Sequence, residues 1–182
     1  MSVVAGARLE TRDIKEKIGT EILSGKEELL GGAHAAEIRD LLERRGVLVF
    51  PQIGFTDEEQ VRFTRTLGNT ARERTGEEVF TISLDPEKSS GVEYLKGSFY
   101  WHFDGVIQAR PILASLLSAK VLPPSGGNTE FCNTYAAYDE LPSQRQVQAV
   151  GLAARWGWHH QAIATAARQK LFNDYDLLYP RP

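Results

Sequence analysis

Apolar and polar positions follow helical spacing in two segments of the first third of the chain. In residues 34–46, apolar residues recur every three to four positions and a glycine closes the pattern. A second segment begins at Thr56, which with Glu59 has the spacing of a capping box, and ends at Gly68. These patterns predict two amphipathic helices. Their buried stripes are expected to include Ile38, Leu41, Leu42, Val61 and Leu67.

Short apolar runs between and after these segments predict strands. Residues 47–50 form a continuous apolar run ended by Pro51, which is typical of a buried strand. Residues 8–22 predict an edge strand, and the glycines of residues 25–32 predict a loop after it. The further predicted strands are residues 79–84, 92–95, 112–122 and 129–133, the last two joined through Pro123-Pro124 and Gly126-Gly127.

The last third of the chain returns to helical patterns. Thr134 is placed to cap a helix over residues 135–141, and Pro142 can open another over residues 144–150. Residues 161–172 predict one more helix. No repeat or low-complexity segment interrupts the chain, and 182 residues are the size of one ordinary domain, so residues 1–182 are expected to form a single domain.

Composition and charge exclude several classes of function. The chain is 42% hydrophobic and 25% charged, and no apolar run is long enough to cross a bilayer, which predicts a globular protein without a membrane partner. The net charge of −3 is spread over the sequence without a basic stripe, which argues against a nucleic-acid partner. No targeting segment is evident, so a cytoplasmic location is expected. Cys132, the only cysteine, is interpreted as a small buried hydrophobic residue.

Candidate chemistry is concentrated in the motif WHFDG at residues 101–105. Side chains alternate along an extended strand, so His102 and Asp104 are expected on one face, where both can reach one ion. An imidazole and a carboxylate on one face suit a non-haem iron(II) site, provided that a second histidine completes the facial triad. A structural or accidental His-x-Asp is the alternative. The tripeptide alone is weak evidence, and its apolar and glycine-rich neighbours strengthen it.

Four segments resemble a known family when they are taken together and in order. They are GVLVFP at residues 46–51, WHFDG at residues 101–105, SAKVLPPSGGNTEF at residues 118–131 and NTYAAYDELP at residues 133–142. In these segments the chain resembles the taurine dioxygenase-like family of iron(II)- and 2-oxoglutarate-dependent dioxygenases. The resemblance is clear over residues 41–141, and the order of the segments makes it more specific than any single motif.

The resemblance implies both a fold and a set of ligands. The fold is a double-stranded β-helix, a jelly roll that is mainly β with flanking helices. His102 and Asp104 match the first two iron ligands of the family, and Thr129 matches a threonine that binds the distal carboxylate of 2-oxoglutarate. The implied cofactor is Fe(II), with 2-oxoglutarate and O2 as co-substrates and ascorbate in support. The implied partner is a small, anionic organic substrate, and a homo-oligomer is expected.

The end of the chain departs from the family pattern. The family takes its third iron ligand from a later histidine and its 2-oxoglutarate-binding arginine from later still, and neither region is present before Pro182. The natural protein is therefore expected to continue, with the jelly roll incomplete here at its C-terminus. His159 and His160 are adjacent, so only one of them could serve, and packed or solvent-facing imidazoles are the preferred interpretation. His34 is expected to be an exposed residue at a helix start.

Substrate contacts are less specific. Tyr94, Ser98 and Phe103 lie on or beside the segment that contains the iron ligands, and for each of them a place in the pocket and a place in the core are equally compatible with the sequence. The rival interpretation to an enzyme is a non-catalytic jelly-roll remnant that acts as a binding or interaction module. Continuation of the reading frame into a histidine and an arginine separates the two.

Overall fold

The computed structural model divides the chain into two compact units. The residues that it describes are 8–70, 76–85, 87, 101–102, 104 and 112–150. One unit comprises Met1–Tyr100 with Leu116–Gln146, and the other comprises Trp101–Ser115 with Val147–Pro182.

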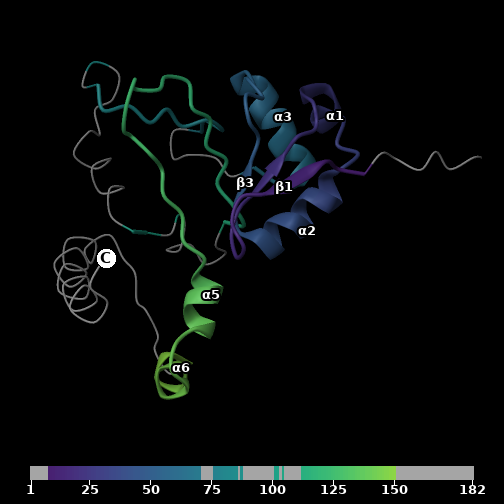
Figure 1. The fold of residues 1–182 in the computed structure, drawn as a ribbon. Coiled ribbons are helices and arrows are strands. Elements are labelled where there is room, and N and C mark those ends of the chain that lie inside the picture. Colours follow the sequence, from purple (N-terminus) through teal and green to yellow (C-terminus); the bar gives the residue numbers. More distant parts are fainter. Residues whose placement is uncertain are drawn as a thin grey trace, which may run out of the picture. The chain divides into compact units, whose positions relative to one another are not determined.

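The first unit contains a small mixed sheet. Strand β1 (Thr11–Asp13) pairs antiparallel with β2 (Thr20–Ile22), and β2 pairs parallel with β3 (Leu48–Val49) (Figure 1). The edge strand predicted over residues 8–22 is thus a hairpin of two short strands. Its turn closes where the Ile14 amide donates to the Gly19 carbonyl at 3.0 Å, and Gly19 has a φ of +84°, which glycine adopts without strain.

Arg45, the last residue of helix α2 (Ala35–Arg45), forms hydrogen bonds with this hairpin. Its guanidinium donates to the hydroxyl of Thr20 at 3.0 Å and to the carbonyl oxygens of Lys15, Glu16 and Gly19. The Thr20 hydroxyl in turn donates to Asp13 at 2.7 Å. The planar guanidinium can satisfy several acceptors at once, so one side chain orders the whole turn.

Three helices lie beside the sheet (Figure 1). Helix α1 (Lys26–Leu30) replaces the loop predicted over residues 25–32. Helix α2 (Ala35–Arg45) confirms the prediction for residues 34–46. Gly46 ends it with a φ of +69°, and the Gly46 amide donates a hydrogen bond to the Leu42 carbonyl at 2.8 Å. The loop prediction failed because Leu29 and Leu30 are buried in the core, which favours a helical turn over an open glycine-rich loop.

Helix α3 (Asp57–Leu67) begins at the predicted capping box. The Glu59 amide donates to the Thr56 hydroxyl at 3.2 Å, and the Thr56 amide donates to the Glu59 carboxylate at 2.8 Å. The side chain of Lys26 also binds Glu59 at 2.8 Å. The hydrogen bond from Lys26, followed by the one from the Thr56 amide, lowers the pKa of Glu59. The capping box therefore also attaches α1 to the start of α3.

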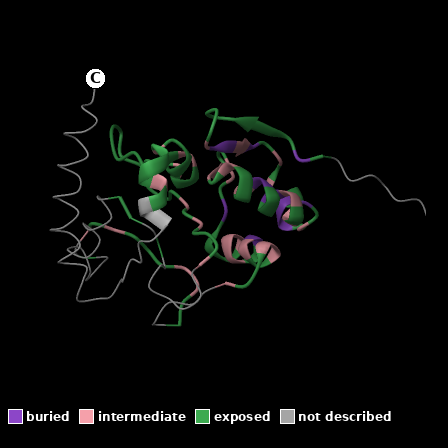
Figure 2. Cartoon of the chain, turned by 90° about the horizontal axis from the view of Figure 1, so that it is seen from below, coloured by how far each residue is buried: buried purple, intermediate pink, exposed green. Residues whose placement is uncertain are grey.

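Among the described residues, the buried core is formed by residues 9–63, and the partly buried Leu67 and Leu116 pack against it. Every buried residue of the described chain falls between Leu9 and Phe63, and the buried positions gather on the sheet and the first three helices (Figure 2). The apolar members of the core are Leu9, Ile22, Leu29, Leu30, Ile38, Leu41, Phe55 and Phe63.

The buried stripe predicted for α3 differs from the observed one. Phe63 is the buried residue of this helix, while Val61 and Leu67 are half-buried. The buried strand predicted over residues 47–50 is present as β3 but is only partly covered, and Val49 is exposed.

Two single-residue predictions were wrong. His34 is the N-cap residue of α2, and it is buried. Its Nε2 lies 2.6 Å from a Glu28 carboxylate oxygen, and its Nδ1 lies 3.4 Å from a Glu37 carboxylate oxygen. Cys132 is exposed, because the segment around it runs outside the core. An apolar neighbour in the sequence is therefore no guide to the burial of this thiol.

Three predicted strands are absent as strands. Residues 79–84, 112–122 and 129–133 are described without regular secondary structure. An apolar run forms a strand only where a partner strand satisfies its backbone, and the described residues supply no such partner. Large side chains in these runs are correspondingly exposed, as Leu113, Leu117 and Val121 show. The strand predicted at residues 92–95 and the helix predicted at residues 161–172 lie outside the described residues.

Two helices follow. Helix α5 (Thr134–Asp139) starts one residue earlier than predicted and is capped by Asn133, whose side-chain oxygen accepts from the Ala136 amide at 3.1 Å. Helix α6 (Ser143–Val150) confirms the helix predicted after Pro142. None of the described helices is both long and apolar enough to span a bilayer. The described residues thus combine a small sheet with helices, and the double-stranded β-helix stays a prediction.

Candidate metal and cosubstrate site

The predicted metal pair is brought together in the second unit. His102 Nε2 lies 3.4 Å from Asp104 Oδ1, and both side chains are partly exposed. No strand is assigned at these two residues, and Asp104 lies in a turn, so the strand geometry expected from the sequence was wrong. The two donors nevertheless lie beside each other. An imidazole nitrogen and a carboxylate oxygen at this separation can share one cation.

The second oxygen of the Asp104 carboxylate has its own partner. The hydroxyl of Ser115 donates to Asp104 Oδ2 at 2.8 Å. The two carboxylate oxygens therefore have different roles, one beside the imidazole and one held by a neutral donor. Sequence reasoning missed Ser115, because nothing in an apolar run that contains two serines indicates which of them contacts a residue eleven positions away.

A third metal ligand is not found in the part of the chain that the structure describes. Those residues contain no cluster that could hold an ion with three or more side chains of histidine, cysteine, aspartate or glutamate. His34 is occupied in the core of the first unit by Glu28 and Glu37. His159 and His160 lie outside the described residues, and so do the suggested substrate contacts Tyr94, Ser98 and Phe103.

Thr129 follows a tight turn in the first unit. Gly126 and Gly127 have φ values of +73° and +70°, a region that residues with a Cβ rarely adopt. A Cβ at Gly127 would lie 2.9 Å from Pro123 Cγ, whereas a Cβ at Gly126 would meet nothing within 4 Å. Gly127 is therefore required both by its positive φ and by the lack of space for a Cβ, whereas Gly126 is required by its positive φ alone. Thr129 itself is exposed two residues later.

Replacing Gly127 by alanine is expected to disturb the position of Thr129 more than the same change at Gly126. Both variants carry the strain of a left-handed backbone, about 1 kcal/mol or more, but only Gly127→Ala also collides with a proline ring. Because the sequence resemblance leads us to expect that Thr129 binds 2-oxoglutarate, the KM for 2-oxoglutarate of the full-length protein should rise in Gly127→Ala and rise less in Gly126→Ala. Equal values for the two variants would contradict the steric argument.

The segment between the metal pair and this turn is attached to α3. The side-chain amide of Gln60 donates to the Leu116 carbonyl at 3.3 Å. Lys120 donates to the Phe55 carbonyl at 2.9 Å and pairs with Asp57 at 2.9 Å. These contacts stand in place of the strand pairing that was predicted for residues 112–122. They link Leu116 and Lys120 to the first turns of α3 and to the residue Phe55 before it.

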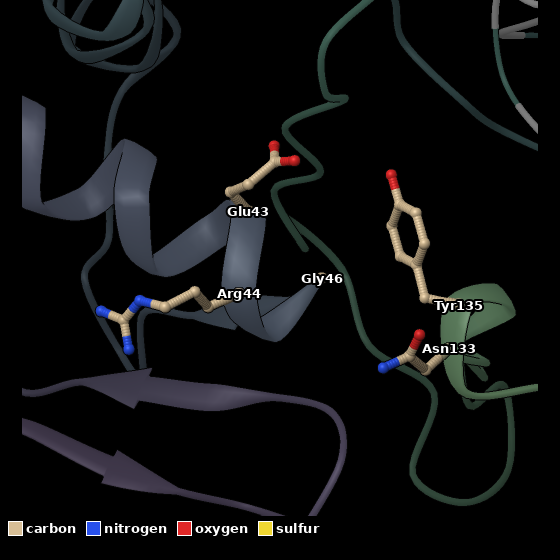
Figure 3. A pocket seen from close by; sticks show the side chains of 5 residues that line it. All are labelled: Glu43, Arg44, Gly46, Asn133 and Tyr135. Carbon is tan, nitrogen blue, oxygen red and sulfur yellow. The ribbon is translucent and has the colours of Figure 1, made fainter. Parts of the chain in front are cut away.

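A separate pocket of about 300 Å³ lies in the first unit (Figure 3). Its walls are the end of α2 and the start of α5, with Glu43, Arg44, Gly46, Asn133 and Tyr135 as its lining residues. None of the predicted site residues lines it. Arg44 is already paired with Asp40 at 2.8 Å, and the Asn133 side chain is used by the cap of α5. The pocket is therefore not a candidate for the metal or its cosubstrate.

Comparison with known proteins gives a consistent match over most of the chain. The model of the family described as "Taurine catabolism dioxygenase TauD, TfdA family" matches residues 10–176. The alpha-ketoglutarate-dependent 2,4-dichlorophenoxyacetate dioxygenase of Cupriavidus pinatubonensis is 34% identical over 144 residues, which cover 70% of this chain and 50% of that protein. The alpha-ketoglutarate-dependent sulfate ester dioxygenase of Pseudomonas putida is 32% identical over 141 residues, 74% of this chain and 44% of that protein.

A solved structure has a backbone similar to that of this chain. The crystal structure of AAD-2 in complex with Mn(II) and N-oxalylglycine matches with a TM-score of 0.65 at 24% identity, covering 86% of this chain and 63% of that one. The chain spans about half the length of the curated relatives that it matches. His102, Asp104 and Thr129 all fall inside the residues that the family model covers.

Proposed function

Because the chain belongs to the TauD/TfdA family of dioxygenases, we propose that the whole protein is an Fe(II)- and 2-oxoglutarate-dependent dioxygenase. The observation that carries this proposal is the separation of 3.4 Å between His102 Nε2 and Asp104 Oδ1 inside the matched residues. The alpha-ketoglutarate-dependent relatives support the same reaction type.

The donor set fits iron(II). A neutral imidazole and a carboxylate are two of the three ligands of a 2-His-1-carboxylate facial triad, which leaves positions open on the metal. In the proposed site His102 and Asp104 hold the iron, and a second histidine from outside the described residues completes the triad. When bound, the iron supplies the activation of O2 that couples decarboxylation of 2-oxoglutarate to oxidation of the substrate.

Thr129 is proposed as the cosubstrate contact of this site. Its hydroxyl can donate a hydrogen bond to a carboxylate oxygen, which is a stronger bond than one to a neutral acceptor. The Gly-Gly turn before it supports the proposal, because the steric limit at Gly127 restricts the backbone that presents the threonine. In this role Thr129 orients the distal carboxylate of 2-oxoglutarate.

A single jelly-roll domain is the proposed framework. One family model runs from residue 10 to residue 176, which supports one domain over residues 1–182. The likeness to AAD-2 supports a shared fold, and the double-stranded β-helix is the form that we propose for it. The predicted cytoplasmic location and homo-oligomer stay predictions.

A small organic anion is the proposed substrate. The relatives are named for 2,4-dichlorophenoxyacetate and for sulfate esters, and both are compact molecules with one anionic group. A charged group at one end and an apolar body at the other suit a pocket that combines a few polar contacts with apolar walls. Hydroxylation of the substrate would be accompanied by release of succinate and CO2.

The proposal is tested with protein expressed from its complete reading frame. Fe(II), ascorbate, O2 and 2-oxoglutarate are supplied with an aryloxyacetate, an alkyl sulfate ester or an alkylsulfonate in turn, and succinate is measured. We expect succinate release that depends on Fe(II) and 2-oxoglutarate and that rises with at least one of these anions. Release that is absent with every anion, or unchanged when 2-oxoglutarate is omitted, would contradict the proposed activity.

A further inference from the structure

The Asp104 carboxylate is held asymmetrically. Its Oδ1 lies 3.4 Å from His102 Nε2, while its Oδ2 accepts a hydrogen bond of 2.8 Å from the Ser115 hydroxyl. All three residues belong to the same compact unit, which includes Trp101–Ser115. The serine thus contacts only the oxygen that is turned away from the imidazole.

This asymmetry has a chemical consequence for a metal ligand. A carboxylate can bind a metal through one oxygen or through both, and the second mode uses an additional coordination position. A facial-triad iron needs its open positions for cosubstrate and oxygen. A donor on the distal oxygen occupies a lone pair of that oxygen and fixes the rotation of the carboxylate about its Cβ–Cγ bond. The oxygen beside His102 then remains available to the metal.

We propose that Ser115 is a positioning residue for the iron ligand Asp104. Its hydroxyl holds Oδ2 and restricts Asp104 to binding through Oδ1. The inference rests on the proposed function, because it assigns to Ser115 the orientation of a ligand of that same site. A hydroxyl suits this role better than a lysine or arginine would, because a neutral donor orients the carboxylate without neutralising the charge that attracts the cation.

The effect of the hydroxyl can be separated from the effect of the side chain's shape by comparing two variants. Threonine and valine have the same shape but only threonine keeps the hydroxyl, and Ser115 is exposed enough to accept either. Ser115→Thr and Ser115→Val are therefore the informative pair, with Ser115→Ala as a third variant. Ser118→Ala is the matched control, because Ser118 lies in the same segment and makes no side-chain hydrogen bond among the described residues.

The primary measurement is Mn(II) binding to the full-length protein, followed by electron paramagnetic resonance of the free ion. Partners that orient metal ligands typically contribute about 10–100-fold to affinity, and we expect a loss of about tenfold in Ser115→Val and Ser115→Ala, because the site is partly exposed. Ser115→Thr and Ser118→Ala should bind Mn(II) as the unmodified protein does. The melting temperature without metal should be the same in the threonine and valine variants.

A second measurement separates orientation from simple loss of metal. At saturating Fe(II), the valine variant should show a higher KM for 2-oxoglutarate than the threonine variant, because a carboxylate that is free to bind through both oxygens competes for the cosubstrate's position. Equal Mn(II) affinity and equal KM in the two variants would overturn the role of Ser115 and leave the proposed activity intact. Unmodified protein that neither binds Mn(II) nor releases succinate would overturn both.

Discussion

Replacing His102 by alanine is expected to abolish Fe(II)-dependent release of succinate. The imidazole is one of only two candidate iron ligands among the described residues, and it lies 3.4 Å from the other. Residues that merely orient a metal ligand contribute about 10–100-fold to metal affinity, so loss of a ligand itself should cost more than that. Mn(II) affinity and succinate release should fall together, and both are measured on the same preparation.

Asp104→Asn supplies the complementary variant. The asparagine oxygen can still accept the hydrogen bond from Ser115, but the negative charge that iron(II) prefers in a ligand is lost. We expect the same loss of activity with an unchanged melting temperature. If succinate release survives in one of the variants, the residue replaced in that variant is not a ligand of the proposed iron site.

His159→Ala and His160→Ala are the controls at the remaining histidines. The sequence favours packed or solvent-facing roles for both, so these variants should retain metal binding. Loss of Mn(II) binding in one of them, to the degree seen in His102→Ala, would instead identify that residue as the third ligand.

Replacing Phe63 by alanine is expected to cost about 3–5 kcal/mol of unfolding free energy in the first unit. Phe63 is fully buried, and its ring lies edge-on to Phe50 at 5.3 Å between centroids and beside Phe55 at 5.4 Å. Alanine would leave a cavity on the inner face of α3, where the neighbouring helices can relax only in part. The loss is measured by urea unfolding followed by circular dichroism.

The neighbouring position on α3 provides the control. Arg62 is exposed, and alanine is the best helix former, so Arg62→Ala should change stability by no more than about 0.5 kcal/mol. A Phe63→Ala protein that unfolds at the same urea concentration as Arg62→Ala would show that the cluster of three phenylalanines does not carry the stability of this unit.

Local signals in the sequence predicted the elements that depend on near neighbours. The capping box of Thr56 and Glu59, the glycine that ends α2 and the proline that precedes α6 all act within four residues, and all three are present. The predicted strands at residues 112–122 and 129–133 required a partner from elsewhere in the chain, and they are not formed among the described residues. The period of a hydrophobic pattern indicates which face could be buried, but not whether another strand covers it.

The same distinction divides the candidate site. The sequence by itself determined the donor types of the candidate metal pair and their spacing of two residues, because these are properties of a contiguous motif. It also indicated the family, through the order of four segments. Only the tertiary structure decided that a turn, and not a strand, brings His102 and Asp104 together, and that Ser115 holds the far oxygen. It also decided that Phe63 is buried and that His34 belongs to the core. These outcomes depend on side-chain packing and on the course of the backbone in three dimensions, which the spacing of residues in the sequence does not specify.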